Sequence, residues 1–148
     1  MKKVIGFLVL ASVFFGMIIS SARMPTTYAA SQVDINIAIE KGLAYLATTQ
    51  AADGHWGGYY YVASTAMAVL SYENAPNNHF AWNLSDPYHT NVQKGLDYLF
   101  ANAYVQTIGV QPAGDPDTNG NGKGIYFYDP WGQTVYQTPM ALMAIVAS

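Results

Sequence analysis

The 148-residue sequence contains no cysteine, and only 10% of its residues are charged. The missing cysteine excludes disulfides, thiolate metal sites, a lipoprotein anchor and a cysteine nucleophile. Basic residues are scarce, with six Lys and Arg in total, so we do not expect nucleic acid as a partner. About half of the residues are hydrophobic and twelve are Tyr, which favours one domain of packed helices over a disordered chain.

The N-terminus has the charge and hydropathy order of a secretory signal. Lys2 and Lys3 precede an apolar run over 4–19, and small residues follow it. Cleavage after Ala22 and cleavage after Ala30 both stay open, and an uncleaved anchor is the alternative because the run is near spanning length. We predict a signal peptide over 1–30 and a secreted, periplasmic or cell-surface protein, with membrane contact only through this segment. Its removal leaves three lysines against nine acidic residues, a net charge of about −6.

A first helix is expected after this segment. Ser31 followed by Asp34 resembles a capping box, and the helical pattern continues to about Thr49. Asp53-Gly54 is a strong turn dipeptide that ends the segment. The apolar residues recur at the spacing of one buried helix face: Ile35, Ile39, Leu43 and Leu46.

Two further helices follow. The alanine-rich residues 65–72 predict a second helix that completes a hairpin with the first. A polar loop over 73–86 separates it from a third helix, for which Asp86 is the expected N-cap and Pro87 the first helical residue.

Two segments of the chain repeat. Residues 94–99 match residues 41–46 as Lys-Gly-Leu-x-Tyr-Leu at an offset of 53, and residues 138–142 echo 65–69 at an offset of 73. The larger offset indicates about twenty extra residues inside the second unit, and helical arrays carry their insertions in loops. The repeat therefore predicts two helical hairpins and one enlarged loop: repeat one over 31–73, repeat two over 86–148, and an inserted loop over 103–130.

Seven positions of the first unit fit the pattern K-G-x2-aromatic-L-x3-Q-x3-G-x-W: Lys41, Gly42, Tyr45, Leu46, Gln50, Gly54 and Trp56. This pattern resembles the QW repeat of squalene and oxidosqualene cyclases, whose superfamily includes the protein prenyltransferase β-subunits. The resemblance implies an all-α fold, here two repeat units of an α/α toroid. It also implies that Gln50 and Trp56 stabilise the repeat from outside, against the alternative of a substrate-facing aromatic.

Two units do not close a ring, since repeat arrays generally need at least three units and capping ends. We therefore expect either an N-terminal fragment of a longer protein or a small domain completed by self-association of exposed hairpin faces.

One polar stretch of the inserted loop has the spacing of a metal site. Oxygen-bearing side chains occupy alternate positions, with glycine at the sixth, as in the first half of an EF-hand-type loop: Asp115, Asp117, Asn119 and Asn121. Position twelve is Tyr126 instead of the closing acid, and Asp129 can replace it only if the loop closes differently. Calcium is therefore the one candidate cofactor, and a plain Asn/Gly-rich turn without metal is the alternative. The D-x-D-D acid of some cyclases is broken here, because Thr118 follows Asp117.

The remaining candidate residues are histidines and aromatics. The three histidines have no metal-motif spacing, and His79 and His89 are expected to face solvent. Two aromatic segments, 59–61 and 126–131, precede the second helix of each unit. Such rings can line a ligand cavity or fill the space between hairpins, and their recurrence in both units favours packing.

No complete catalytic motif is present. The leading hypothesis is an exported, non-catalytic binding or scaffold module for a small molecule or a protein. The alternative is a piece of a terpenoid-cyclase-like (squalene-hopene cyclase-like) or prenyltransferase-like enzyme whose catalytic half is not in this chain.

Overall fold

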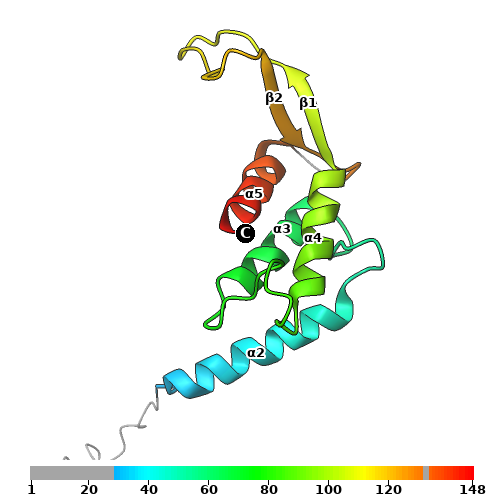
Figure 1. Cartoon of the computed structure of the whole chain (residues 1–148), viewed down its shortest axis with the longest axis vertical. Helices are drawn as coiled ribbons and strands as arrows, with labels where there is room; N and C mark the ends of the chain where they lie inside the picture. The colour runs from blue at the N-terminus through cyan, green and yellow to red at the C-terminus, as the bar shows by residue number, and fades with distance from the viewer. Residues whose placement is uncertain (1–28, 132–133) are drawn as a thin grey trace, which may run out of the picture. The chain divides into compact units, whose positions relative to one another are not determined.

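The computed structural model describes residues 29–131 and 134–148, and the elements below all belong to the unit Gln32–Ser148. The predicted signal peptide lies outside the described residues, except for its last two. The described part is mainly helical, and no helix in it is long and apolar enough to cross a membrane. The elements in chain order are α2 (Gln32–Thr49), α3 (Tyr61–Glu73), α4 (His89–Ala101), β1 (Ala103–Thr107), β2 (Lys123–Phe127) and α5 (Thr134–Ala147), shown in Figure 1.

The helix α2 has the predicted bounds, whereas α3 and α4 begin elsewhere. The helix α3 starts at Tyr61, four residues before the predicted start, because the Asp129 carboxylate accepts the Val62 N–H at 2.8 Å and caps it from a distant part of the sequence. The helix α4 starts at His89. Asp86 accepts the Tyr88 N–H at 2.7 Å and so forms a turn before the helix instead of its N-cap.

A β-hairpin corrects the all-α prediction and the predicted loop over 103–130. The strands β1 and β2 pair antiparallel, from Ala103 opposite Phe127 to Thr107 opposite Lys123. Both strands contain aromatic and β-branched residues, and the paired rings of Tyr104 and Tyr126 stack with centroids 5.5 Å apart. Asn- and Gly-rich residues occupy only the connection between the strands, so the insertion is a hairpin with a polar tip.

The helix α3 is the centre of the core. It packs against α4 on one side and α5 on another (Figure 1). The buried apolar cluster comprises Leu43, Trp56, Val62, Ala66, Ala68, Val69, Tyr72, Ala75, Val92, Leu96, Leu99, Phe127, Ala141 and Ala144. These side chains come from both predicted hairpins, so one core joins the two units.

The helix α2 contributes much less to this core than its sequence predicts. Leu43 is buried and Leu46 is partly buried, but Ile35 and Ile39 of the same stripe are 42% and 36% exposed. The periodicity correctly predicted the helix and wrongly predicted that the whole stripe is covered, because the first half of α2 extends beyond α3 and α4.

The two predicted units share one kind of hydrogen bond, from a backbone N–H to a threonine hydroxyl. The Trp56 N–H donates to Thr65 Oγ1 at 3.1 Å, and the Phe127 N–H donates to Thr138 Oγ1 at 3.0 Å. Trp56 and Phe127 are both buried, at 4% and 2% exposure. Each of these buried aromatic residues is thus bonded through its N–H to a threonine of the following helix, which lies nine residues on from Trp56 and eleven from Phe127.

The glycine of the Lys-Gly pair has opposite surroundings in the two units, which gives a matched test. A Cβ at Gly95 would lie 2.6 Å from Val69 Cγ2 and 2.9 Å from Trp56 Cζ3, whereas a Cβ at Gly42 would meet nothing within 4 Å. We expect Gly95→Ala to lower the free energy of unfolding by about 1–3 kcal/mol through overpacking. Gly42→Ala should raise it by roughly 0.5–1 kcal/mol, because alanine loses less backbone entropy in a helix. Urea denaturation measures both, and equal effects would contradict the packing.

Candidate functional site

The glutamine of the motif joins three segments. Gln50 Nε2 donates to the carbonyls of Gly54 and Asn91, both at 2.9 Å. Asn91 Nδ2 returns a hydrogen bond to Gln50 Oε1 at 2.8 Å. The amide of Gln50 thus connects the end of α2, the turn after it and the first turn of α4, and both of its N–H groups are engaged in these contacts.

The tryptophan of the motif closes the end of α2. Trp56 Nε1 donates to the Leu46 carbonyl at 2.8 Å, one of the acceptors that a helix end leaves without a partner. Gly54 has φ +100°, and a Cβ there would lie 2.2 Å from the Lys94 carbonyl oxygen. The turn of the first unit therefore packs directly on the Lys-Gly pair of the second unit.

The structure brings only part of the seven-residue motif together. Gln50, Gly54 and Trp56 form one cluster with Leu46 beneath it. The other three motif residues are exposed on α2: Lys41, Gly42 and Tyr45.

The second unit has no copy of this clamp. The residue equivalent to Gln50 is Ala103, the first residue of β1. Asn102 closes the helix instead, with its N–H on the Leu99 carbonyl at 3.0 Å and its Nδ2 on the Tyr98 carbonyl at 2.9 Å. The hairpin therefore replaces the glutamine clamp at the end of α4.

The side chains of the predicted calcium loop are engaged with the loop's own backbone. Asp117 accepts the N–H groups of Asn121 and Gly122, at 3.1 and 2.6 Å. The Asp115 carboxylate accepts the Asp117 N–H at 2.9 Å, and Asn119 Oδ1 accepts the Asn121 N–H at 3.2 Å. These hydrogen bonds are local turns that fix the loop. The described residues contain no group of three or more His, Cys, Asp or Glu that could hold a metal ion.

Asp129, considered above as a closing acid for that loop, has a different place. It is 1% exposed and accepts N–H groups from Val62, Trp131 and the side chain of Gln137, at 2.8, 3.0 and 2.9 Å. Its carboxylate joins the N-terminus of α3 to α5, so it does not close the loop. No local sequence pattern predicts this role, because Val62 lies 67 residues away.

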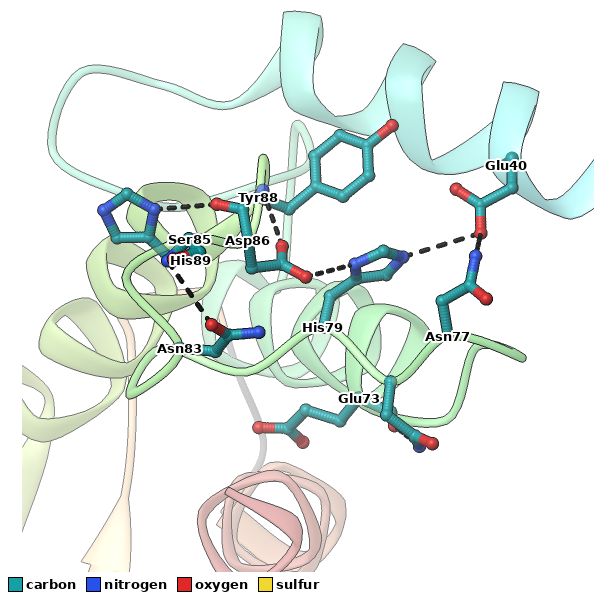
Figure 2. Close-up of polar contacts among 10 residues, drawn as sticks. Glu40, Glu73, Asn77, His79, Asn83, Ser85, Asp86, Tyr88 and His89 are labelled. Carbon is teal, nitrogen blue, oxygen red and sulfur yellow. Dashed lines mark hydrogen bonds and ion pairs between the residues drawn. The ribbon is translucent and has the colours of Figure 1, made fainter.

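His79 is buried, which corrects the prediction that it faces solvent. It is 4% exposed, and its Nδ1 lies 2.8 Å from Asp86 Oδ2 (Figure 2). Its Nε2 lies 3.6 Å from Glu40 Oε1, too long for a hydrogen bond. The same Glu40 oxygen accepts a hydrogen bond from Asn77 Nδ2 at 2.8 Å. The aspartate–histidine pair therefore fastens the loop between α3 and α4 and points its second nitrogen at α2.

Glu73 is a third buried ionisable group, after Asp129 and His79, whose burial the sequence did not predict. It is 2% exposed at the end of α3, and Ser148 Oγ donates to its Oε1 at 2.5 Å. Burial raises the pKa of the Glu73 carboxyl above its usual value. The folded state therefore holds the Glu73 proton more tightly than the unfolded state does. As the pH rises from the ordinary carboxyl pKa toward the raised one, this group lowers the free energy of unfolding.

The two aromatic segments do meet, and they meet at the surface. Tyr59 and Trp131 have ring centroids 5.5 Å apart, and Tyr60 and Tyr136 have centroids 5.9 Å apart, both edge to face. Tyr59 and Trp131 are 65% and 55% exposed. These rings fasten the start of α3 to the segment after β2, and their outer faces remain accessible.

An apolar groove lies between α2 and α3. Two adjoining hollows of about 430 and 560 Å³ form it, and they share Tyr45, Leu46 and Ser71. Gly42 lies on its α2 side and Ala68 on its α3 side, and no charged residue lines either hollow. This composition suits an apolar helix or a hydrophobic ligand more than a charged substrate.

Comparisons with protein-family models, with curated proteins and with solved structures find no match for this chain. The resemblance to the cyclase repeats therefore stands on the motif residues alone.

A structural role for Gln50 predicts a loss of stability when its side chain is shortened. Gln50→Ala leaves the Gly54 carbonyl and the Asn91 amide without partners, and we expect the free energy of unfolding to fall by about 1–3 kcal/mol. The matched control is Gln93→Ala, which removes an exposed hydrogen bond to Asp97 and should change stability by less than about 0.5 kcal/mol. Chemical denaturation compares the two, and a neutral Gln50→Ala would argue against the clamp.

Proposed function

We propose that this protein is an exported, non-catalytic helical-repeat module that binds a protein partner through apolar helix faces. One observation carries the proposal: the first half of α2 exposes a series of large apolar side chains. Val33, Ile35, Ile37 and Ile39 are 36–66% exposed, and Tyr45 is 68% exposed. Ile35 and Ile39 lie one turn apart on one side of α2, and Val33 and Ile37 lie on the opposite side, so this half of the helix exposes apolar surface on both sides. Exposed apolar patches on folded proteins mark interaction surfaces.

The contacts of the polar residues also support a non-catalytic role. Gln50, Asp86 and Asp129 are the groups whose setting most resembles a functional site, and each is held in contacts that join helices or loops. The resemblance to cyclases depends on Gln50 and Trp56, and both serve the clamp. This resemblance therefore supports two units of an α/α toroid as the proposed architecture. It does not identify a catalytic residue for the alternative, an enzyme fragment.

Site-specific photocrosslinking in the producing cell tests the binding proposal. A benzoylphenylalanine placed at Tyr45, in the groove, should give a discrete adduct with a partner protein. The same group placed at Val110, which is 76% exposed on the hairpin tip, should not. Adducts at neither position, or equally at both, would remove the support for α2 as a binding face.

We also propose calcium as the ligand of the loop over 115–122. The spacing of its oxygens and the glycine at its sixth position support this, and extracellular calcium is high enough to occupy weak sites. The proposed ligands are the side chains of Asp115, Asp117 and Asn119 and the main-chain carbonyl of Asn121. They are few for calcium, so the proposed site is weak and completed by water.

Thermal melting with and without calcium tests the loop. Millimolar calcium should raise the melting temperature of the full chain, because a ligand that binds only the folded state stabilises it. Asp117→Asn should abolish the increase, since it removes one of two charged ligands, whereas Asp97→Asn on α4 should leave it unchanged. A melting temperature that is the same in calcium and in chelator would show that the backbone turns alone shape the loop.

A further inference from the structure

Equivalent positions of the two hairpins are covered in one unit and open in the other. On α4, the glycine of the Lys-Gly pair contacts Val69 of α3, as described above for Gly95. The equivalent Gly42 on α2 has no neighbour within 4 Å of a Cβ position. The surrounding residues agree: Val92 is 0% exposed, and its equivalent Ile39 is 36% exposed. The helix α2 thus carries the residue pattern of the docking face of α4. Among the described residues this face is open at Ile39 and Gly42, whereas Leu43 is buried in the core.

The helix α5 shows the matching difference from α3. The face that α3 presents to α4 is fully buried, with Val62 and Val69 both at 0% exposure. The offset of 73 places Val135 and Leu142 of α5 at these positions, and they are 85% and 45% exposed. Val146, one turn beyond Leu142, is 84% exposed and extends this apolar surface, although its equivalent on α3 is the buried Glu73. The helix α5 therefore carries the same stripe as α3, turned toward solvent.

The floor of the groove also repeats. The helix α5 packs along α3, and its buried residues there include the small Ala141 and Ala144, both 0% exposed. The equivalent residues on α3 are Ala68 and Ser71, which line the α2–α3 groove. A helix with the packing surface of α3 would therefore meet in this groove small residues equivalent to those that α3 meets on α5.

From this equivalence we propose that α5 of one copy docks into the α2–α3 groove of a second copy, with Leu142 against Gly42 as Val69 lies against Gly95. The contact would continue the array by the same operation that relates the two hairpins within one chain. It is a heterologous, head-to-tail contact, so it can propagate to further copies or close into a ring. The inference rests on the proposed binding function and identifies its partner as the protein itself.

Charge is consistent with this contact. The helix α5 contains no charged residue between Thr134 and Ala147, and the groove is lined by none. Docking would therefore bury apolar surface without removing an ion from water, which is the expensive step in many interfaces.

Two blocking substitutions, one on each face, test the head-to-tail arrangement in the full chain. Gly42→Gln fills the α2–α3 groove, which is the head of this contact, and Leu142→Glu places a charge on the exposed stripe of α5, which is the tail. Both residues are exposed, so the fold of each copy should persist. Their controls are Ala44→Gln, on the opposite side of α2, and Val110→Glu, on the hairpin tip. Sedimentation velocity or light scattering after gel filtration gives the mass of each species.

The wild type and both controls should form oligomers that grow with concentration, and each blocked variant alone should be a monomer. Mixing the two blocked variants should restore a 1:1 complex, because one keeps a free tail and the other a free head. A blocked variant that still dimerises alone would show a symmetric contact and overturn the proposal, and so would a wild type that stays monomeric at all concentrations.

The crosslinking experiment separates this failure from failure of the binding function. An adduct at position 45 with a different protein would keep α2 as a binding face while removing the second copy as its occupant. The absence of any adduct there would remove both.

Discussion

The seating of Trp56 between α2, α3 and α4 is the contact on which the rest of this structure depends. Its indole N–H satisfies the end of α2, its backbone N–H is fixed by Thr65 of α3, and its ring lies against the bare backbone of Gly95 on α4. One side chain therefore sets the approach of three helices. The ring can reach α4 only because position 95 has no Cβ, so the glycine of one unit and the tryptophan of the other are a single packing constraint. The Lys-Gly pair and the tryptophan turn belong to the same interface, although 38–41 residues separate them in the chain.

Buried polar groups complete the framework by joining segments that are distant in sequence. Asp129 ties α3 to the start of α5, and His79 with Asp86 ties down the loop before α4. Burying such groups without partners costs several kcal/mol, so each is stable only when its partners arrive with the tertiary fold. This explains why the most chemically suggestive residues of the chain are occupied. Their hydrogen bonds are needed to hold the array together, and a substrate would have to compete with them.

The sequence predicted what depends on local pattern. Helical periodicity located α2, and the spacing from Lys41 to Trp56 identified a turn that clamps a helix end. Local pattern did not predict the early start of α3 or the burial of His79, because both depend on partners elsewhere in the chain. The hairpin over 103–127 was missed for another reason: the Asn- and Gly-rich tip dominates the composition of the insertion and hides two five-residue strands. Periodicity also could not show that Ile35 and Ile39 lie open, since a stripe reveals that a face is apolar and not what covers it.

That last point connects folding to association. In an array of hairpins each unit buries its apolar stripe only against its neighbours, so stability arises at the interfaces between units. Here one such interface, between α3 and α4, is formed inside the chain, and it covers Val69 and Val92 completely. The equivalent faces on α2 and α5 have the same residue pattern and stay open at Ile39, Gly42 and Leu142. Because covering them would stabilise the fold through the same contacts that hold its two halves together, folding and assembly of this protein should draw on one kind of interface.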